Sequence, residues 1–232
     1  MPRAIGFLVY PGFQLLDATG PIAAFEIAAR FSPGAYSLHF LSLRGEPTPS
    51  SSGLVIQTTA LEEARPLDTL IVSGGDGVKV PASCPKTLAF VRKAGREARR
   101  VASVCSGAYV LAEAGLLDGK RATTHWSRTK DFQRRYPNIR LEPDRIWIQD
   151  GKVWSSAGIT AGIDLSLALI GADLGEAIAR RTAQQLVVYH HRPGGQSQHS
   201  ALIDLRPGRF DALLSWARQN LAEPLSVEQL AD

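Results

Sequence analysis

Cys105 occupies a position that is typical of a reactive thiol. The short apolar run Val101–Val104 predicts a buried strand that ends at Cys105, and from Ala108 onward the apolar residues are spaced for one face of a helix. A strand that runs directly into a helix forces a sharp turn, which lifts the cysteine clear of the sheet and directs helix N–H groups toward it. Because such groups favour a thiolate, the pattern predicts a cysteine version of the nucleophile elbow.

The residues after Cys105 support a turn of this kind. Gly107 allows the chain to pack tightly, and Ser106 is small and polar. Free cysteines are also among the most buried residue types, so a purely structural Cys105 remains an alternative. In either case the strand-to-helix junction predicts a ligand pocket at this point.

Asp17, Gly74 and Gly75 follow two further predicted strands. Asp17 comes after the first apolar run of the chain, and the two glycines follow the run at residues 67–72, with only Ser73 between. Ligand crevices of parallel α/β sheets lie at the carboxyl ends of strands, so we expect these residues to meet Cys105. The glycine pair lets backbone N–H groups approach a ligand, although the spacing of phosphate-binding loops is absent. Asp17 has an alternative role as the cap of the following helix.

His125 follows a short extended segment and is expected to face the same edge of the sheet as Cys105. The alternative, a surface or capping histidine, stays open. The adjacent His190 and His191 cannot share one helix face, so we predict no metal site and no cofactor.

The composition predicts a globular α/β protein. The chain has 232 residues, of which 44% are hydrophobic and 21% are charged. Strands alternate with helices along the sequence, which predicts a flavodoxin-like, doubly wound, mainly parallel sheet with helices on both faces and a short helical C-terminal extension.

Hydropathy, cysteine content and charge limit the compartments and partners that the sequence predicts. The apolar runs are too short to cross a bilayer, the N-terminus lacks the layout of a signal peptide, and only Cys84 and Cys105 are present, so we predict a cytoplasmic protein with no membrane partner. The net charge is +4, and residues 176–232 contain six Arg and six acidic residues. This balance leaves no basic stripe for DNA in the C-terminal part.

The C-terminal part differs in composition from the rest. We predict a first domain at residues 1–190, a polar, Gly-rich linker at 191–206 and the start of a further domain at 207–232, with an amphipathic helix over 209–221. A capping box at 226–229 opens another helix that stops at Asp232, so we expect a helical domain that is cut short.

Several segments resemble known families. Residues 15–21, 72–75, 104–107, 114–126 and 156–164 resemble the PfpI-type, class I glutamine amidotransferase-like superfamily. Residues 190–198 and 225–231 resemble AraC-family transcriptional regulators of the GlxA-like kind, in which a PfpI-type domain precedes a double helix-turn-helix domain.

The resemblance implies roles for individual residues. Cys105 matches the nucleophile, Gly75 with the N–H of Ser106 matches the oxyanion donors, and Asp17 matches the acid that hydrogen-bonds the cysteine in the isocyanide hydratase branch. Protease-like members place a histidine directly after the cysteine, and here that residue is Ser106, so the Cys–His dyad is absent.

Two functions follow from these observations. The first is the ligand-sensing and dimerising domain of an AraC-family regulator, which forms a homodimer and binds DNA as the full-length protein but not specifically through residues 1–232. Its small-molecule ligand would contact Asp17, Gly74, Gly75, Cys105, Ser106 and His125. The alternative is a cysteine-dependent enzyme of the PfpI or isocyanide hydratase type that acts on a small electrophile, with Cys105 and Asp17 as catalytic residues.

Overall fold

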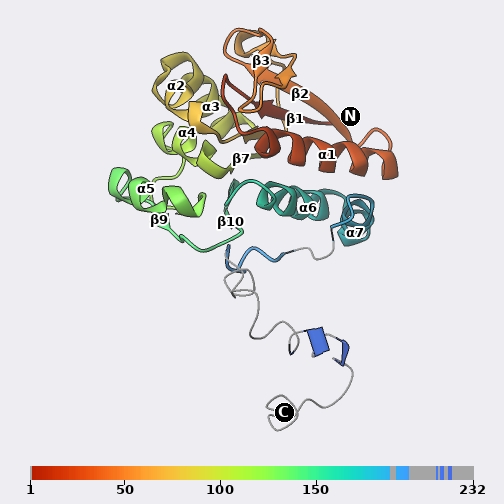
Figure 1. The fold of residues 1–232 in the computed structure, drawn as a ribbon. Coiled ribbons are helices and arrows are strands. Elements are labelled where there is room, and N and C mark those ends of the chain that lie inside the picture. The colour runs from red at the N-terminus through yellow and green to blue at the C-terminus, as the bar shows by residue number, and fades with distance from the viewer. Residues whose placement is uncertain (1, 189–191, 199–212, 214, 217–218, 221–232) are drawn as a thin grey trace. The chain divides into compact units, whose positions relative to one another are not determined.

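A seven-stranded sheet forms the centre of the computed structural model of the chain, which describes residues 2–188, 192–198, 213, 215–216 and 219–220 (Figure 1). Its strands, in spatial order, are β10 (Trp147–Asp150), β11 (Val153–Ser156), β7 (Arg100–Val104), β6 (Thr69–Val72), β1 (Arg3–Leu8), β2 (Tyr36–Ser42) and β5 (Thr59–Ala60). Two small two-stranded sheets pair β3 (Thr48–Pro49) with β4 (Val55–Ile56), and β8 (Arg121–Ala122) with β9 (Arg140–Leu141).

The helices connect these strands or, in the case of the last two, follow them. They are α1 (Leu15–Phe31), α2 (Lys79–Ser83), α3 (Pro85–Glu97), α4 (Ala108–Glu113), α5 (Thr129–Arg135), α6 (Ala161–Leu174) and α7 (Glu176–Gln185). Short 3₁₀ turns span Leu61–Glu63, Asp76–Val78, Cys105–Gly107 and Trp126–Arg128. No helix in the described part of the chain is long and apolar enough to cross a membrane.

The sheet is mainly parallel. All of its neighbouring strands pair in parallel except β10 and β11, which pair antiparallel. The parallel strands β2, β1, β6, β7 and β11 lie side by side in the order of a flavodoxin-like sheet. The predicted fold class is therefore confirmed, and the carboxyl ends of β1, β6 and β7 lie at one edge.

Side-chain alternation along the strands builds two cores. In β6, Leu70 and Val72 pack with residues of α3 and α4, whereas Ile71 between them packs with residues of α1, α6 and α7. Figure 1 shows α2, α3 and α4 grouped apart from α1 and α6. Both faces of the central strands are covered, which explains why these strands read as continuous apolar runs.

The observed elements have two notable boundaries. The helix α1 begins at Leu15, so Pro21 lies inside it. The strand β4 has only two residues and lies in a small separate sheet. The helix predicted at 209–221 and the capping box at 226–229 lie outside the described residues, apart from 213, 215–216 and 219–220.

The chain divides into two compact units at Gln198. The first unit is Met1–Gln198 and the second is His199–Asp232. Residues 192–198, which the sequence places in a linker, therefore belong to the unit that carries the sheet.

Candidate functional site

Cys105 lies at a strained turn between β7 and α4. Its φ angle is +57°, in the left-handed region that non-glycine residues rarely adopt, and the 3₁₀ turn Cys105–Gly107 leads directly into the helix. A Cβ added to Gly107 would lie 2.3 Å from the carbonyl oxygen of Val72 on the neighbouring strand. The turn therefore requires a glycine at this position, and the predicted elbow geometry is observed.

Four of the residues singled out from the sequence meet at this turn. A Cβ added to Gly74 would lie 2.5 Å from Asp17 Oδ2, 2.7 Å from Cys105 Cβ and 2.7 Å from the Ser106 nitrogen. Gly74 thus packs against both the Asp17 carboxyl group and the elbow, with no room for a side chain. The carboxyl ends of β6 and β7 bring these residues together, as the topology requires.

Asp17 lies inside the first turn of α1 and does not act as the N-terminal cap that one interpretation of the sequence suggested. Its Oδ1 accepts a hydrogen bond of 2.6 Å from the backbone N–H of Ile159. The carboxyl group is fully buried, and burial raises its pKa to about 6, while the Ile159 amide and the Cys105 side chain act in the opposite direction.

The two cysteines have opposite shifts. Burial, followed by the negative charge of Asp17, raises the pKa of the Cys105 thiol well above its usual value, and the backbone N–H of Ser106 only partly opposes this. The expectation that helix amides make Cys105 acidic is therefore wrong for this structure. Cys84, just before α3, has a lowered pKa because the Thr87 hydroxyl and amide stabilise its thiolate.

The amide expected to act as an oxyanion donor is already engaged. The Gly75 N–H donates to Ser106 Oγ at 2.8 Å, and the Ser106 hydroxyl lies 3.1 Å from the Gly75 carbonyl oxygen. Ser106 is buried, so this pairing is shielded from water. The Gly75 amide is consequently not free to bind a developing anion unless Ser106 moves.

A turn at Gly158–Ile159 completes the site and has no role in the sequence-based prediction. A Cβ on Gly158 would lie 2.1 Å from Cys105 Cβ, and Ile159 has a φ of +53° that aims its N–H at Asp17. Residues 157–162 are mostly small, a pattern that fits close packing but does not identify the element they pack against. The contact joins parts of the chain too distant in sequence for local patterns to pair.

His125 comes to the site through its neighbour. Its Nδ1 is bonded to the Ser127 hydroxyl at 2.8 Å and accepts from the Ser127 N–H at 3.3 Å, so the ring caps the 3₁₀ turn that follows. The Thr124 hydroxyl donates to the Cys105 carbonyl oxygen at 2.9 Å. Thr124 therefore holds the backbone of the elbow at Cys105. A contact between His125 and a ligand stays a prediction.

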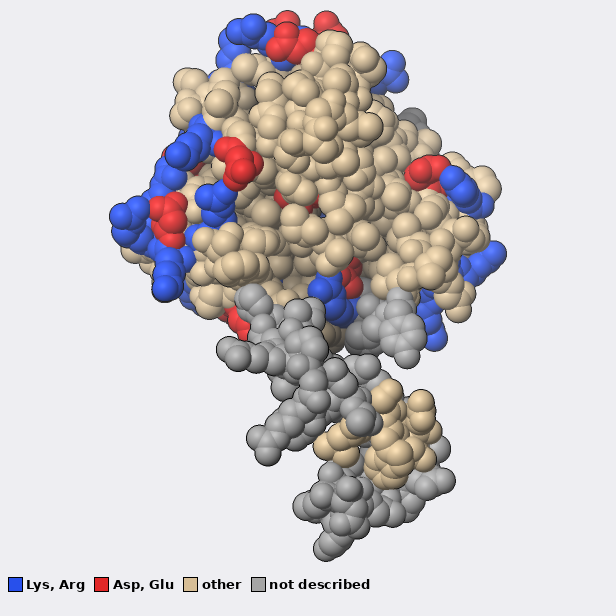
Figure 2. All heavy atoms as spheres, viewed as in Figure 1, with Lys and Arg blue, Asp and Glu red and all other residues tan. Residues whose placement is uncertain are grey.

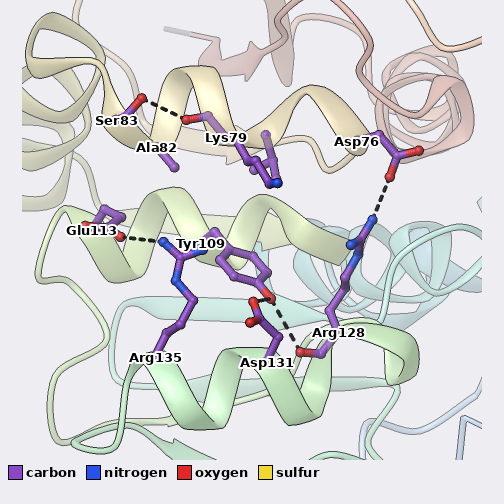
Figure 3. A pocket seen from close by; sticks show the side chains of 10 residues that line it. Asp76, Lys79, Ala82, Ser83, Tyr109, Glu113, Arg128, Asp131 and Arg135 are labelled. Atoms are coloured by element: carbon purple, nitrogen blue, oxygen red, sulfur yellow. Dashed lines mark hydrogen bonds and ion pairs between the residues drawn. The ribbon is translucent and has the colours of Figure 1, made fainter.

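A pocket of about 380 Å³ opens between α2, α4 and α5 (Figure 3). Tyr109 of α4 donates to Asp131 at 2.9 Å, and an ion pair of 2.6 Å between Arg128 and Asp76 bridges one end. Asp76 directly follows Gly75, but Cys105 is not part of the lining. The pocket is thus a neighbour of the elbow rather than its opening.

No group of three or more His, Cys, Asp or Glu side chains within the described ranges could hold a metal ion.

Comparisons with known proteins agree with this geometry. The model of the DJ-1/PfpI family matches residues 3–172. Isonitrile hydratase of Pseudomonas putida is 39% identical over 185 residues, which cover 77% of either chain. The HTH-type transcriptional regulator CdhR of Pseudomonas aeruginosa is 35% identical over 195 residues, which cover 83% of this chain and 57% of the regulator. A ThiJ/PfpI family protein from Pseudomonas syringae superposes with a TM-score of 0.74 at 28% identity, over 94% of this chain and 87% of that one.

Proposed function

The chain belongs to the DJ-1/PfpI family, and on this premise we propose that residues 1–190 are the ligand-sensing and dimerising domain of an AraC-type transcriptional regulator. The resemblance to regulators that carry a PfpI-type domain is confirmed by the match to CdhR. The chain spans 57% of the length of that regulator, so DNA binding and dimerisation belong to the proposal. We place the protein in the cytoplasm, where its DNA target lies.

The engagement of the Gly75 amide by Ser106 carries the proposal. An enzyme of the elbow type needs a free amide for the developing anion and a thiolate at the working pH. In this site Ser106 Oγ occupies the amide, and burial raises the pKa of the Cys105 thiol, which disfavours the thiolate. These features favour a pocket that holds a small molecule without converting it.

The ligand would bind where the carboxyl ends of the strands meet. Asp17, Gly74 and Cys105 converge there, with Ser106 beneath them. Gly75 and His125 complete the proposed set. A buried carboxyl group with a pKa of about 6 can accept or donate a hydrogen bond near neutral pH, which suits a polar metabolite with an amide or amine group.

The alternative function is a hydratase-like enzyme. The relationship to isonitrile hydratase and the juxtaposition of Asp17 with Cys105 favour it. Cys105 would attack a small electrophile, and Asp17 would serve as acid and base. This activity requires the Ser106 hydroxyl to leave the Gly75 amide during the reaction.

A thermal-shift screen of small metabolites, amines and amides tests the sensor. We expect at least one compound to raise the Tm of the wild type but not of Cys105→Ala, with Arg135→Ala, in the neighbouring pocket, as the matched control that still responds. The same samples are incubated with an isonitrile. Turnover that is lost in Cys105→Ala and in Asp17→Asn would favour the enzyme and contradict the sensor.

A further inference from the structure

The segment 192–198 is bonded to the sheet-bearing unit at both of its ends. At the first end, the Arg192 backbone N–H donates to Asp164 Oδ1 at 2.9 Å, and its guanidinium donates to Oδ2 at 2.6 and 3.0 Å. A further guanidinium N–H reaches the Thr160 hydroxyl at 2.9 Å. Asp164 is buried, so this charge-assisted, multiply bonded contact is of a stronger kind than an exposed surface pair.

At the other end, Gln198 inserts its amide among backbone groups. Its Nε2 lies 3.0 Å from the Thr124 carbonyl oxygen, and its Oε1 accepts from the Trp126 N–H at 3.0 Å. The carbonyl oxygens of Pro143 and Arg145 lie 3.0 and 3.1 Å from the same Nε2. One side chain thus joins the strand-end loop at 123–126 to the loop at 143–145.

The middle of the segment is held as well. The Ile146 N–H lies 3.1 Å from the Gly194 carbonyl oxygen and 3.2 Å from that of Gln196. The Ser197 hydroxyl and the Gln198 N–H both donate to Asp144 Oδ1, at 2.9 and 2.8 Å. The segment therefore docks along its whole length.

Both anchors adjoin residues that hold Cys105. Thr124 donates its hydroxyl to the Cys105 carbonyl oxygen and accepts from Gln198 at its own carbonyl. Ile159 donates its N–H to Asp17, and the next residue, Thr160, accepts from Arg192. Both paths, one through Thr124 and one through Ile159 and Thr160, end on the same seven-residue segment.

There is little free space between Cys105 and the turn at 158–160, which carries the path to Arg192. Gly158 packs so closely that a Cβ would lie 2.1 Å from Cys105 Cβ and 2.7 Å from its Cα. Ile159, with φ at +53°, has few alternative conformations that keep its N–H on Asp17. A group that occupies this space must move the turn at 158–160, because close-packed interiors shift as units rather than compress.

We propose that the docked segment 192–198 senses the occupancy of the Cys105 site: a group placed on the thiol displaces the turn and releases the segment. The biological role of this coupling rests on the proposed function. The segment leads directly into residue 199 and the rest of the chain, so its release would carry the signal toward the C-terminal part. Because a group can be placed on the thiol only when the turn has moved, release of the segment, which lowers the free energy of that movement, should also raise the rate at which Cys105 is modified.

The first experiment measures alkylation of Cys105 by iodoacetamide in Arg192→Ala, Gln198→Ala and the double variant, with mass spectrometry to separate the two cysteines. We expect Cys105 to react at least about fivefold faster than in the wild type, the lower range of typical coupling. Cys84 is the internal standard and should react at its wild-type rate. The matched controls are Arg30→Ala, which removes an exposed ion pair to Glu26, and Gln149→Ala, which removes a bond within its own turn.

The second experiment reverses the direction and keeps the segment intact. In a Cys84→Ser background, Cys105 is alkylated and hydrogen exchange is followed at the amides of Arg192 and Gln198. We expect both to exchange at least about fivefold faster after alkylation, because the alkylated thiol keeps the turn displaced and lowers the free energy of opening at both anchors. Unchanged exchange, or unchanged Cys105 rates in the folded variants, would overturn the coupling. No metabolite is used, so a failed ligand screen bears on the proposed function alone.

Discussion

Asp17 and Ile159 are 142 positions apart in the chain, and the Ile159 N–H donates to Asp17 Oδ1 at 2.6 Å. The bond joins the first turn of α1 to the turn that precedes α6, on either side of Cys105. Because Asp17 is buried and has a pKa of about 6, its charge state changes within the physiological range.

The stability of the protein should depend on the ionisation of Asp17. Its pKa rises from 3.8 to about 6 on folding, so the folded state binds more protons between these values and stability falls as the pH rises through this window. A shift of this size corresponds to about 3 kcal/mol. Asp17→Asn cannot ionise and keeps an acceptor for Ile159. Urea unfolding at pH 4 and pH 8 should show the variant gaining about 2–3 kcal/mol on the wild type at the higher pH. A pH-independent difference would contradict the burial argument.

Cys84 should react faster than Cys105, although the sequence places Cys105 at the turn that is typical of a reactive thiol. At pH 8 Cys84 should be alkylated faster than Cys105, because Thr87 and its amide lower the pKa of Cys84 while burial and the charge of Asp17 raise that of Cys105. Asp17→Asn removes the second cause and should accelerate Cys105 severalfold. Time-resolved mass spectrometry gives both rates in one sample. Faster labelling of Cys105 in the wild type would contradict this prediction and would show that the helix amides lower the pKa of its thiol.

Asp173 should be the most sensitive ionic position of the sheet-bearing unit. The carboxylate is fully buried, is bonded to the buried Arg100, and accepts from Arg99 at 2.7 Å and from the Tyr36 hydroxyl at 3.1 Å. Asp173→Ala leaves the Arg100 guanidinium buried without its carboxylate, which costs about 3–5 kcal/mol of unfolding free energy. Glu26→Ala, which removes an exposed pair, is the control and should cost less than about 1 kcal/mol in the same urea titration. Equal losses of unfolding free energy in the two variants would show that the ion pair between Asp173 and Arg100 does not stabilise the fold more than an exposed pair does.

The protein should be a homodimer through residues 1–190. Regulators of this kind read paired half-sites, which two-fold symmetry of the protein matches. Sedimentation equilibrium at micromolar concentration checks this, with residues 1–190 alone as the comparison. A monomer at high micromolar concentration would refute the dimer, and a dimer only of the longer chain would move the interface to the C-terminal part.

Residues 1–232 alone should bind no DNA site specifically. The alignment to CdhR covers 57% of that regulator, and a helix-turn-helix reads bases with its second helix. On the face in Figure 2, Lys and Arg are interspersed with Asp and Glu around the rim rather than joined in a stripe. A gel-shift titration in moderate salt is the measurement. Selective, sub-micromolar retention of a promoter fragment would show that the DNA-reading element lies within these residues.

The sequence by itself determined the fold class and the elbow. Residues 101–104 form a short apolar run that passes into helical spacing at Ala108, and this change of period places Cys105 at a turn whatever the rest of the chain does. Gly74 likewise lies two residues after a buried strand, so parallel pairing brings it to the same edge. These features depend on neighbours within a few positions, which is why local patterns predict them.

Only the tertiary structure decided which residues of the site are hydrogen-bonded to one another and which are buried. The sequence supports two roles for Asp17, and its contact with Ile159 forms only when α1 and α6 pack together. The helix amides at Cys105 predict a lowered pKa, but desolvation, which depends on everything packed around the thiol, outweighs them. Ser106 engages Gly75 from 31 positions away, and Gln198 reaches Thr124 from 74. Burial and long-range hydrogen bonds are properties of the packed chain, so no local pattern of residue types encodes them.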